Sequence, residues 1–273
     1  MKSKEVFPGV FSRHARAYRD RVMDVVSRRQ ARGRLAVLEK VAAKPGERIL
    51  DLACGPGTLT LPVGAAVGPD GRVIGVDLAP GMIELLREAA PANVEARLGD
   101  MDHLDFADAS FDAVTCGHGL QFVPDLGAAL REARRVLRPG GRYVASVPAE
   151  GFSGGIREVI GDLLDSVPSA PTVSDRLATV EVLRDPEGWR DAALEAGFAR
   201  ADVSAYEEVV SYPTAADAAA RTVSWWDFAW RLEQVTPEAR AAIAEAIEER
   251  LRERVQRWPL ELPGRTHVLY AVK

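Results

Sequence analysis

Residues 49–60 read ILDLACGPGTLT, and they indicate the fold more clearly than any other stretch of the chain. The apolar residues on either side of Asp51 make a short run that is typical of a buried parallel strand. Gly55 and Gly57 then predict a tight turn, and an apolar helical stretch follows. A glycine turn between a strand and a helix lets a ligand lie against bare backbone at the start of the helix.

The charge beside this turn indicates which ligand it binds. Asp51 precedes the two glycines, so a pyrophosphate would be repelled, whereas a ligand that is cationic or zwitterionic at this point would be attracted. S-adenosylmethionine carries an amino group and a sulfonium and has this chemistry. The alternative is a dinucleotide, whose fingerprint places a third glycine at position 60, where this chain has Thr60.

Three segments resemble a known family. Residues 51–58, DLACGPGT, resemble the glycine-rich turn of class I S-adenosylmethionine-dependent methyltransferases. Residues 11–18, FSRHARAY, resemble the F-x-x-x-A-x-x-Y lead of small-molecule methyltransferases related to the ubiquinone and menaquinone C-methylases, and residues 119–125, GLQFVPD, look like the same group. The resemblance implies methyl transfer to O, N or C of a small aromatic or hydrophobic molecule, such as a quinone or another natural product.

The composition is that of a soluble globular protein. The chain has 273 residues, of which 47% are hydrophobic and 27% charged. Neither an apolar run of the ~20 residues needed to span a bilayer nor a signal-peptide core is present, so we predict a cytoplasmic protein. Cys54 and Cys116 have no metal-ligand or disulfide spacing, and we predict buried thiols and no metal site.

The charge is unevenly distributed along the chain. Through Arg48 there are thirteen Lys+Arg against five Asp+Glu, although the net charge of the whole chain is −5. A nucleic-acid surface is one interpretation of this basic start. No aromatic residues interleave with Arg28, Arg29, Arg32 and Arg34, so we favour a solvated helix face.

Strands and helices are predicted to alternate, which favours a parallel sheet with helices on both faces. Apolar runs predict strands at residues 48–52, 73–76, 94–98, 111–115, 142–147, 201–210 and 266–272. Helical spacing and caps predict helices at 11–41 (one or two), 58–67, 80–90, 126–137, 156–164, 186–196, 215–232 and 237–258. With the family resemblance, we expect a Rossmann-like seven-stranded, mostly parallel sheet with one antiparallel strand and a helical substrate cap.

The same elements suggest a division of the chain. We expect N-terminal lid helices at 1–46, a cofactor-binding core at 47–150, a cap segment at 151–184, completion of the core at 185–210, a helical cap insertion at 211–264 and a final core strand at 265–273.

Four predicted strand ends would meet in one crevice, where open α/β sheets bind ligands. Asp77 ends the second strand and can accept both hydroxyls of a ribose. By resemblance, Asp100 would face the adenine amino group, and Asp51 the methionine amino group directly or through water. Each aspartate could instead be a helix cap or a solvated group. The full predicted cofactor set is Tyr18, Asp51, Ala53, Gly55, Gly57, Asp77, Leu78, Met82, Asp100, Met101, Asp102, Cys116, Gly117, His118 and Gln121.

The acceptor would be bound by aromatic residues at both ends of the chain. Phe11, His14 and Tyr18 lie three and four apart and would share a helix face over the cofactor, or simply pack. A second helix carries Trp225, Trp226 and Trp230, which either line an acceptor pocket or belong to the core. We therefore expect the substrate-binding residues Phe11, His14, Trp225, Trp226 and Trp230.

Methyl transfer from a sulfonium is an in-line displacement, so positioning supplies most of the acceleration. A general base can assist an oxygen or carbon nucleophile, and His118, with an expected pKa near neutral, is the first candidate and His14 the second. His118 could also merely line the pocket.

Two other functions remain open. A relative that binds S-adenosylmethionine could catalyse cyclisation or isomerisation without methylating. An RNA methyltransferase is disfavoured, because Cys116, Gly117 and His118 stand where enzymes that methylate base amines resemble one another in an acidic or Asn residue followed by two prolines. The expected partner is a small molecule; the oligomeric state is open, with a homodimer as one alternative.

Overall fold

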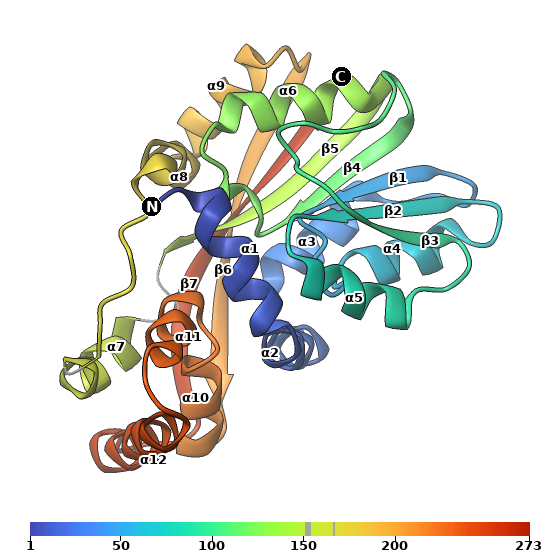
Figure 1. The fold of residues 1–273 in the computed structure, drawn as a ribbon. Helices are drawn as coiled ribbons and strands as arrows, with labels where there is room; N and C mark the ends of the chain where they lie inside the picture. The colour runs from blue at the N-terminus through green and yellow to red at the C-terminus, as the bar shows by residue number, and fades with distance from the viewer. Residues whose placement is uncertain (151–153, 166) are drawn as a thin grey trace.

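Seven strands form one sheet in the order β3-β2-β1-β4-β5-β7-β6 (Figure 1). This computed structural model describes residues 1–150, 154–165 and 167–273; residues 151–153 and 166 of the expected cap segment lie outside the described residues. Neighbouring strands from β3 to β5 are parallel, and β7 is antiparallel to both β5 and β6, which confirms the predicted fold class. The strands are β1 (Arg48–Leu52), β2 (Arg72–Asp77), β3 (Val94–Leu98), β4 (Phe111–Gly117), β5 (Leu137–Glu150), β6 (Arg200–Tyr212) and β7 (Leu260–Val272).

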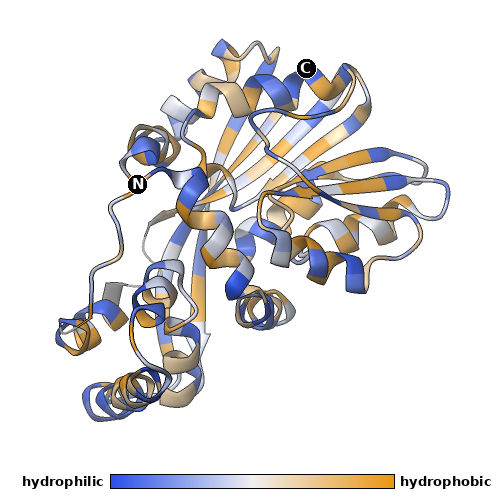
Figure 2. Ribbon diagram, in the orientation of Figure 1, coloured by the Kyte–Doolittle hydropathy of each residue, from blue (hydrophilic) through white to orange (hydrophobic). Residues whose placement is uncertain are grey.

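Helices cover both faces of the sheet because its strands are apolar on both sides (Figure 2). Side chains alternate along β1, so Ile49 packs in one hydrophobic cluster and Leu50 and Leu52 pack in the opposite one. The helices in the cluster of Ile49 are α3 (Arg32–Val41), α4 (Thr60–Val67) and α5 (Pro80–Ala89). The helices in the opposite cluster are α6 (Leu126–Val136), α8 (Leu177–Arg184) and α9 (Pro186–Glu195).

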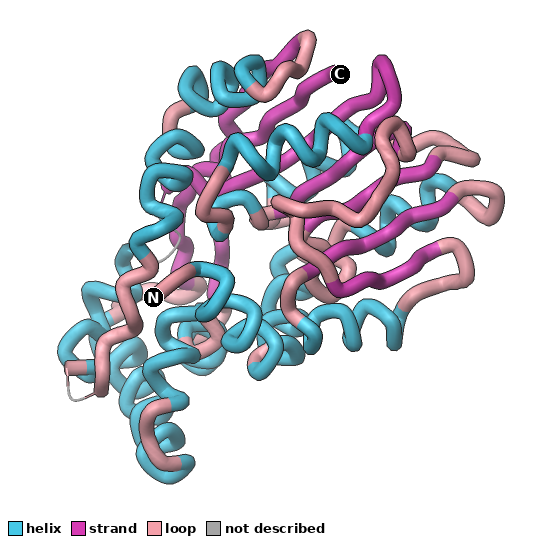
Figure 3. Tube along the Cα trace, turned by 45° about the horizontal axis from the view of Figure 1, so that its top comes forward, coloured by secondary structure: helices cyan, strands magenta, loops and turns pink. Residues whose placement is uncertain are grey.

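The antiparallel pair of β6 and β7 continues past the end of the sheet, further than the predicted strands at 201–210 and 266–272. The register runs unbroken from Arg200 opposite Val272 to Tyr212 opposite Leu260, whereas β5 pairs only with Arg265 and later residues of β7. Separate helices bury the apolar side chains of this outer half, setting a helical group apart from the sheet (Figures 1 and 3). These helices are α7 (Gly154–Ile160), α10 (Ala215–Thr222) and α12 (Pro237–Arg254).

The N-terminal region forms more helices than predicted. Helix α1 (Ser3–Arg13) precedes α2 (Ala15–Ser27), and the helical conformation is interrupted at His14 between them. The aromatic helix predicted at 215–232 is also two helices, α10 and α11 (Trp226–Glu233). Short 3-10 turns complete the elements, namely η1 (Leu120–Phe122), η2 (Gly161–Leu164) and η3 (Ser174–Arg176).

Helix α1 packs directly on the start of α5. A Cβ added to Gly81 would lie 2.5 Å from the backbone oxygen of Ser12, so only glycine permits this approach. The Gly81 amide also donates to Ser12 Oγ at 3.2 Å. Among the described residues, no helix is both long and apolar enough to cross a membrane.

Candidate functional site

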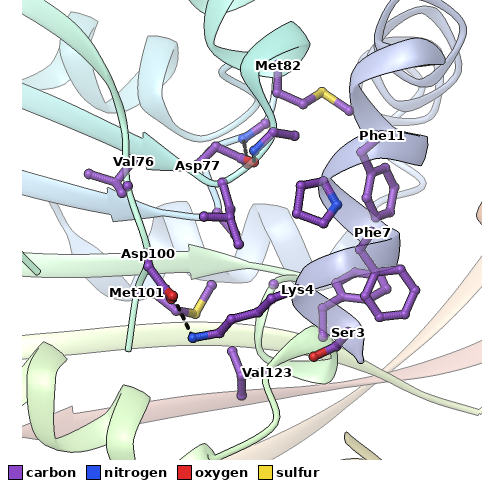
Figure 4. A pocket seen from close by; sticks show the side chains of 18 of the residues that line it. Ser3, Lys4, Phe7, Phe11, Val76, Asp77, Met82, Asp100, Met101 and Val123 are labelled. Atoms are coloured by element: carbon purple, nitrogen blue, oxygen red, sulfur yellow. Dashed lines mark hydrogen bonds and ion pairs between the residues drawn. The ribbon is translucent and has the colours of Figure 1, made fainter. Parts of the chain in front are cut away.

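A cavity of about 120 Å³ lies where four strand ends meet α1 (Figure 4). Residues at or just after the ends of β1, β2, β3 and β4 form its inner wall, and five residues of α1 form its outer wall. It collects eleven predicted site residues: Phe11, Tyr18, Ala53, Gly55, Asp77, Leu78, Met82, Asp100, Met101, Gly117 and His118.

The glycine turn exposes backbone to this cavity. Ala53 and Gly55 have φ of +49° and +54°, in the left-handed region, and both line the cavity. Gly57 lies behind them with φ of +97°, where a Cβ would meet Leu86 Cδ1 at 2.7 Å. Gly57 therefore allows the turn to pack on α5 and does not line the cavity.

Asp51 lies beneath the glycine turn and is only 1% exposed. Its carboxylate accepts hydrogen bonds from Thr60 Oγ1 at 2.6 Å and Thr115 Oγ1 at 2.8 Å. Burial raises the pKa of Asp51 to about 6, and the two hydroxyls oppose that shift. The structure thus places this carboxylate between β1, β4 and α4 and not on the cavity wall.

Asp77 lies on the cavity wall at the end of β2. One carboxylate oxygen accepts a hydrogen bond from the Gly55 amide at 2.8 Å, and the other accepts one from the Ala79 amide at 2.9 Å. Burial raises its pKa, while these amide hydrogen bonds oppose the shift. A carboxylate has about four lone-pair sites, so roughly two remain for a ligand with neighbouring hydroxyls.

Lys4, which the sequence analysis missed, joins α1 to the end of β3. Its ammonium lies 2.5 Å from Asp100 Oδ2 and 2.8 Å from Asp102 Oδ2, and Figure 4 shows the side chain crossing the cavity. Asp100 lines the cavity, whereas Asp102 is 6% exposed and lies behind it. Burial raises the pKa of Asp102 despite this ion pair.

His118 lies at the junction of this cavity with a second, larger one, and lines both. Its φ of +60° turns the chain after β4, and its Nε2 is buried without a hydrogen-bond partner among the described residues. Burial, together with the nearby Arg34 charge, lowers its pKa well below the usual value. The imidazole is therefore neutral at pH 7, in contrast to the near-neutral pKa expected from the sequence.

The helix break at His14 separates this residue from Phe11 and Tyr18, with which it was expected to share a helix face. Phe11 and Tyr18 pack edge to face, with ring centroids 5.6 Å apart, and both line the two cavities. His14 lines neither; its Nε2 lies 2.7 Å from Glu233 Oε1, which also accepts from Arg13. A continuous helix would have been needed to bring His14 beside the other two.

The second cavity, of about 530 Å³, lies between the sheet and the helical group. Gln121 faces it and not the first cavity, with its side-chain amide donating to the His118 carbonyl at 2.7 Å. Of the three tryptophans expected here, Trp225 and Trp226 line it, and Trp226 packs edge to face on Phe7. Trp230 packs instead in the cluster between α1 and α11.

Six arginines line the second cavity: Arg21, Arg34, Arg157, Arg176, Arg184 and Arg221. The expectation of a solvated face is wrong for Arg34, which is 8% exposed and donates to the Tyr18 hydroxyl at 3.2 Å. A signal was available, since Arg34 precedes the buried Val37 and Val41 by three and seven residues, which is helical spacing on the buried face.

The remaining predictions fall outside the cavities. Cys116 is fully buried in the sheet, where burial raises the pKa of its thiol to about 12. Among the described residues, no group of three or more His, Cys, Asp or Glu side chains is placed to hold a metal ion.

The chain is similar to known methyltransferases in sequence and in fold. Residues 49–141 match the family model described as a methyltransferase domain. Demethylmenaquinone methyltransferase of Staphylococcus aureus strain JH9 is 40% identical over 145 residues, which are 52% of this chain and 60% of that protein. The chain thus spans 60% of the length of the curated relatives that it matches first.

Solved structures of low sequence identity share the fold. One from Bacillus halodurans C-125, described as a methyltransferase, has a TM-score of 0.54 at 21% identity and covers 88% of this chain and 98% of that one. Phosphoethanolamine N-methyltransferase 2 of Haemonchus contortus, solved with S-adenosyl-L-methionine, has a TM-score of 0.51 at 19% identity and covers 88% and 52%.

These matches confirm the resemblance to class I S-adenosylmethionine-dependent methyltransferases that residues 51–58 predicted. The chain is also similar to a demethylmenaquinone methyltransferase, in line with the resemblance of residues 11–18.

Proposed function

We propose that this protein is a cytoplasmic S-adenosylmethionine-dependent methyltransferase that acts on a small aromatic or hydrophobic molecule. The observation that carries the proposal is the Asp77 carboxylate, which two backbone amides hold on the cavity wall beside the left-handed turn at Ala53 and Gly55. This arrangement suits a ribose and a cationic amino acid moiety, because it offers lone pairs and a negative potential at the strand ends.

The residues of the first cavity would hold the cofactor along its length. Asp77 would accept the ribose hydroxyls, Asp100 would accept from the adenine amino group, and Leu78 and Met82 would flank the base. The backbone at Gly55 and Gly117 would lie beside the methionine moiety. Since Lys4 now holds Asp100, we expect α1 to shift when the site is filled.

S-adenosylmethionine supplies an electrophilic methyl group when it is bound. The chain supplies alignment, because Phe11, Tyr18, His118 and Phe122 line both cavities and would hold an acceptor at their junction. Helix α1 contributes Phe11 to this junction and would exclude water from it when the site is filled. His118 is neutral, and its Nε2 has no hydrogen-bond partner in the part of the chain that the structure describes. In the tautomer that carries its own proton on Nδ1, Nε2 would accept the proton of a hydroxyl nucleophile.

The expected division of the chain accords with this function. We propose that residues 47–150, 185–210 and 265–273 form the cofactor core, that 1–46 form a lid, and that 151–184 and 211–264 form the acceptor cap. Trp225 and Trp226 on the wall of the second cavity support the assignment of the last segment.

Calorimetric titration of S-adenosylmethionine into wild type and Asp77→Ala tests the cofactor assignment. Loss of a charge-assisted hydrogen bond costs about 1.5–3 kcal/mol, so the affinity of the variant should fall roughly tenfold or more. Asp125→Ala is the matched control, because Asp125 also accepts a backbone amide, that of Ala128 at 2.8 Å, but lines neither cavity.

Equal affinities of Asp77→Ala and wild type would refute the assignment of the ribose site. Absence of binding to folded wild type would remove the main support for the proposed function. The mass of the product then separates methylation from isomerisation, because only methylation adds a methyl group.

A further inference from the structure

We propose that the second cavity selects an acceptor that carries an anionic group, a carboxylate or a phosphate, on an aromatic or otherwise apolar body. The inference rests on the proposed function, since it names the substrate class of the same site. It stands on the six arginines of the cavity wall, which the charge of the whole chain, −5, gives no reason to expect.

The positive charge of the cavity exceeds its negative charge. Two carboxylates, Glu208 and Asp227, line the same wall. Asp227 pairs with Arg157 at 2.6 Å, and Glu208 accepts the Gly33 amide at 2.6 Å and is 4% exposed. Among the described residues, no carboxylate lies within ion-pair distance of Arg21, and the aromatic ring of Tyr18 lies 5.0 Å from its guanidinium carbon.

Buried guanidinium groups at this wall retain unused hydrogen-bond donors. Arg34 and Arg221 are each 8% exposed, and their Nε and Nη1 atoms, respectively, have no partner among the described residues. Arg221 forms an ion pair with Asp24 through a different nitrogen. Burial lowers the pKa of Arg21 and of Arg221. Buried charges and donors are costly unless paired, so an anionic ligand would stabilise this wall.

Aromatic side chains alternate with these arginines. Trp225, Trp226, Phe122 and Tyr212 line the cavity, and the Arg221 guanidinium carbon lies 5.3 Å from the centroid of the Tyr212 ring. An apolar body would pack on these rings while its anionic group contacts Arg21 and Arg34. Because His118 borders both cavities, the remaining end of such a molecule would lie at the junction with the cofactor site.

Three naphthalene probes test the proposal by calorimetry with S-adenosylhomocysteine in excess: 2-naphthoate, 2-naphthyl phosphate and neutral 2-naphthamide. We expect at least one anionic probe to bind about tenfold or more tightly than the amide, and the stronger of the two identifies the head group. Arg21→Gln should reduce this preference several-fold, because it removes one of the two guanidinium groups that would contact the anionic group. Among the described residues Arg21 pairs with no carboxylate, so the substitution breaks no ion pair.

Arg19→Gln is the matched control, as Arg19 lies on the same helix, pairs with Asp20 and lines neither cavity. It should retain the preference. In wild type, added KCl should weaken binding of the anionic probes and leave the amide unaffected.

Equal affinity for the three probes, binding of none of them, or an anion preference as large in Arg21→Gln as in wild type would each overturn the proposal. Titration of S-adenosylhomocysteine alone separates the two hypotheses. Without its binding, the methyltransferase proposal fails even where the anion preference of the second cavity persists.

Discussion

Asp51 and Asp77 end neighbouring strands, yet their surroundings give the two carboxyl groups different tasks. Asp77 accepts backbone amides and borders the first cavity, whereas Asp51 accepts two threonine hydroxyls within the protein. The sequence predicted both as ligands because it shows the position of each at a strand end. It does not show whether a threonine on the next helix donates a hydrogen bond to the carboxylate.

The raised pKa of Asp51 predicts a pH dependence of stability. The unfolded carboxyl ionises near 3.8, and the folded one keeps its proton to about pH 6. The folded state thus binds more protons in this window, so the free energy of unfolding falls as pH rises from about 4 to 6. Asp51→Asn removes this dependence. From pH 4 to 6, the free energy of unfolding of wild type should therefore fall by about 3 kcal/mol relative to that of the variant, at 1.36 kcal/mol per pKa unit.

Urea unfolding of both proteins between pH 4 and 8 measures that difference. The other buried carboxyls are common to both proteins and cancel. A difference that stays constant across the window would show that Asp51 ionises normally in the folded protein.

At the scale of the element, α1 forms the outer wall of the proposed cofactor site, and its position depends on one glycine. Gly81→Ala would place a methyl group 2.5 Å from the Ser12 carbonyl oxygen, and backbone must move to accommodate it. We expect S-adenosylhomocysteine to bind several-fold more weakly and amide exchange in residues 3–13 to become faster, as measured by calorimetry and mass spectrometry. Gly161→Ala is the control, because nothing lies within 4 Å of its Cβ.

The same helix shows where prediction from sequence reached its limit. Strands β1 to β4 and β6 and helices α4, α5, α6 and α9 were predicted to within two residues, because apolar periodicity records burial on a sheet. Strands β5 and β7 begin five and six residues before the predicted strands, and α8 was not predicted. No helix boundary was predicted for the part of α1 before Phe11, because it contains Pro8 and because the partners of α1, such as Asp175 and Glu233, are distant in the sequence. Lys4 and the arginines of the second cavity other than Arg34 were missed because charged residues give no periodic apolar signal.

At the scale of the whole molecule, the first cavity lies between α1 and the ends of β1 to β4. S-adenosylhomocysteine at a hundredfold excess over its Kd should raise the free energy of unfolding by about 2.7 kcal/mol. Amide hydrogen exchange measured by mass spectrometry should become slower on binding, mainly in residues 3–13 and in the turn at 53–57. Exchange in α12 should not change, because α12 packs in a separate cluster. Uniform protection along the chain, or none in α1, would contradict a lid role for this helix.

The contacts of α1 also have a consequence for how the chain folds. Ser3 binds Asp175 across 172 positions of sequence, and Arg13 binds Glu233 across 220. Closing loops of this length costs chain entropy that neighbouring strands do not incur, so such contacts form late. The sheet and its glycine turn can be in place while the N-terminal helix still moves freely. The first helix in the sequence is therefore expected to be among the last to settle, and the cofactor site remains open to solvent until it does.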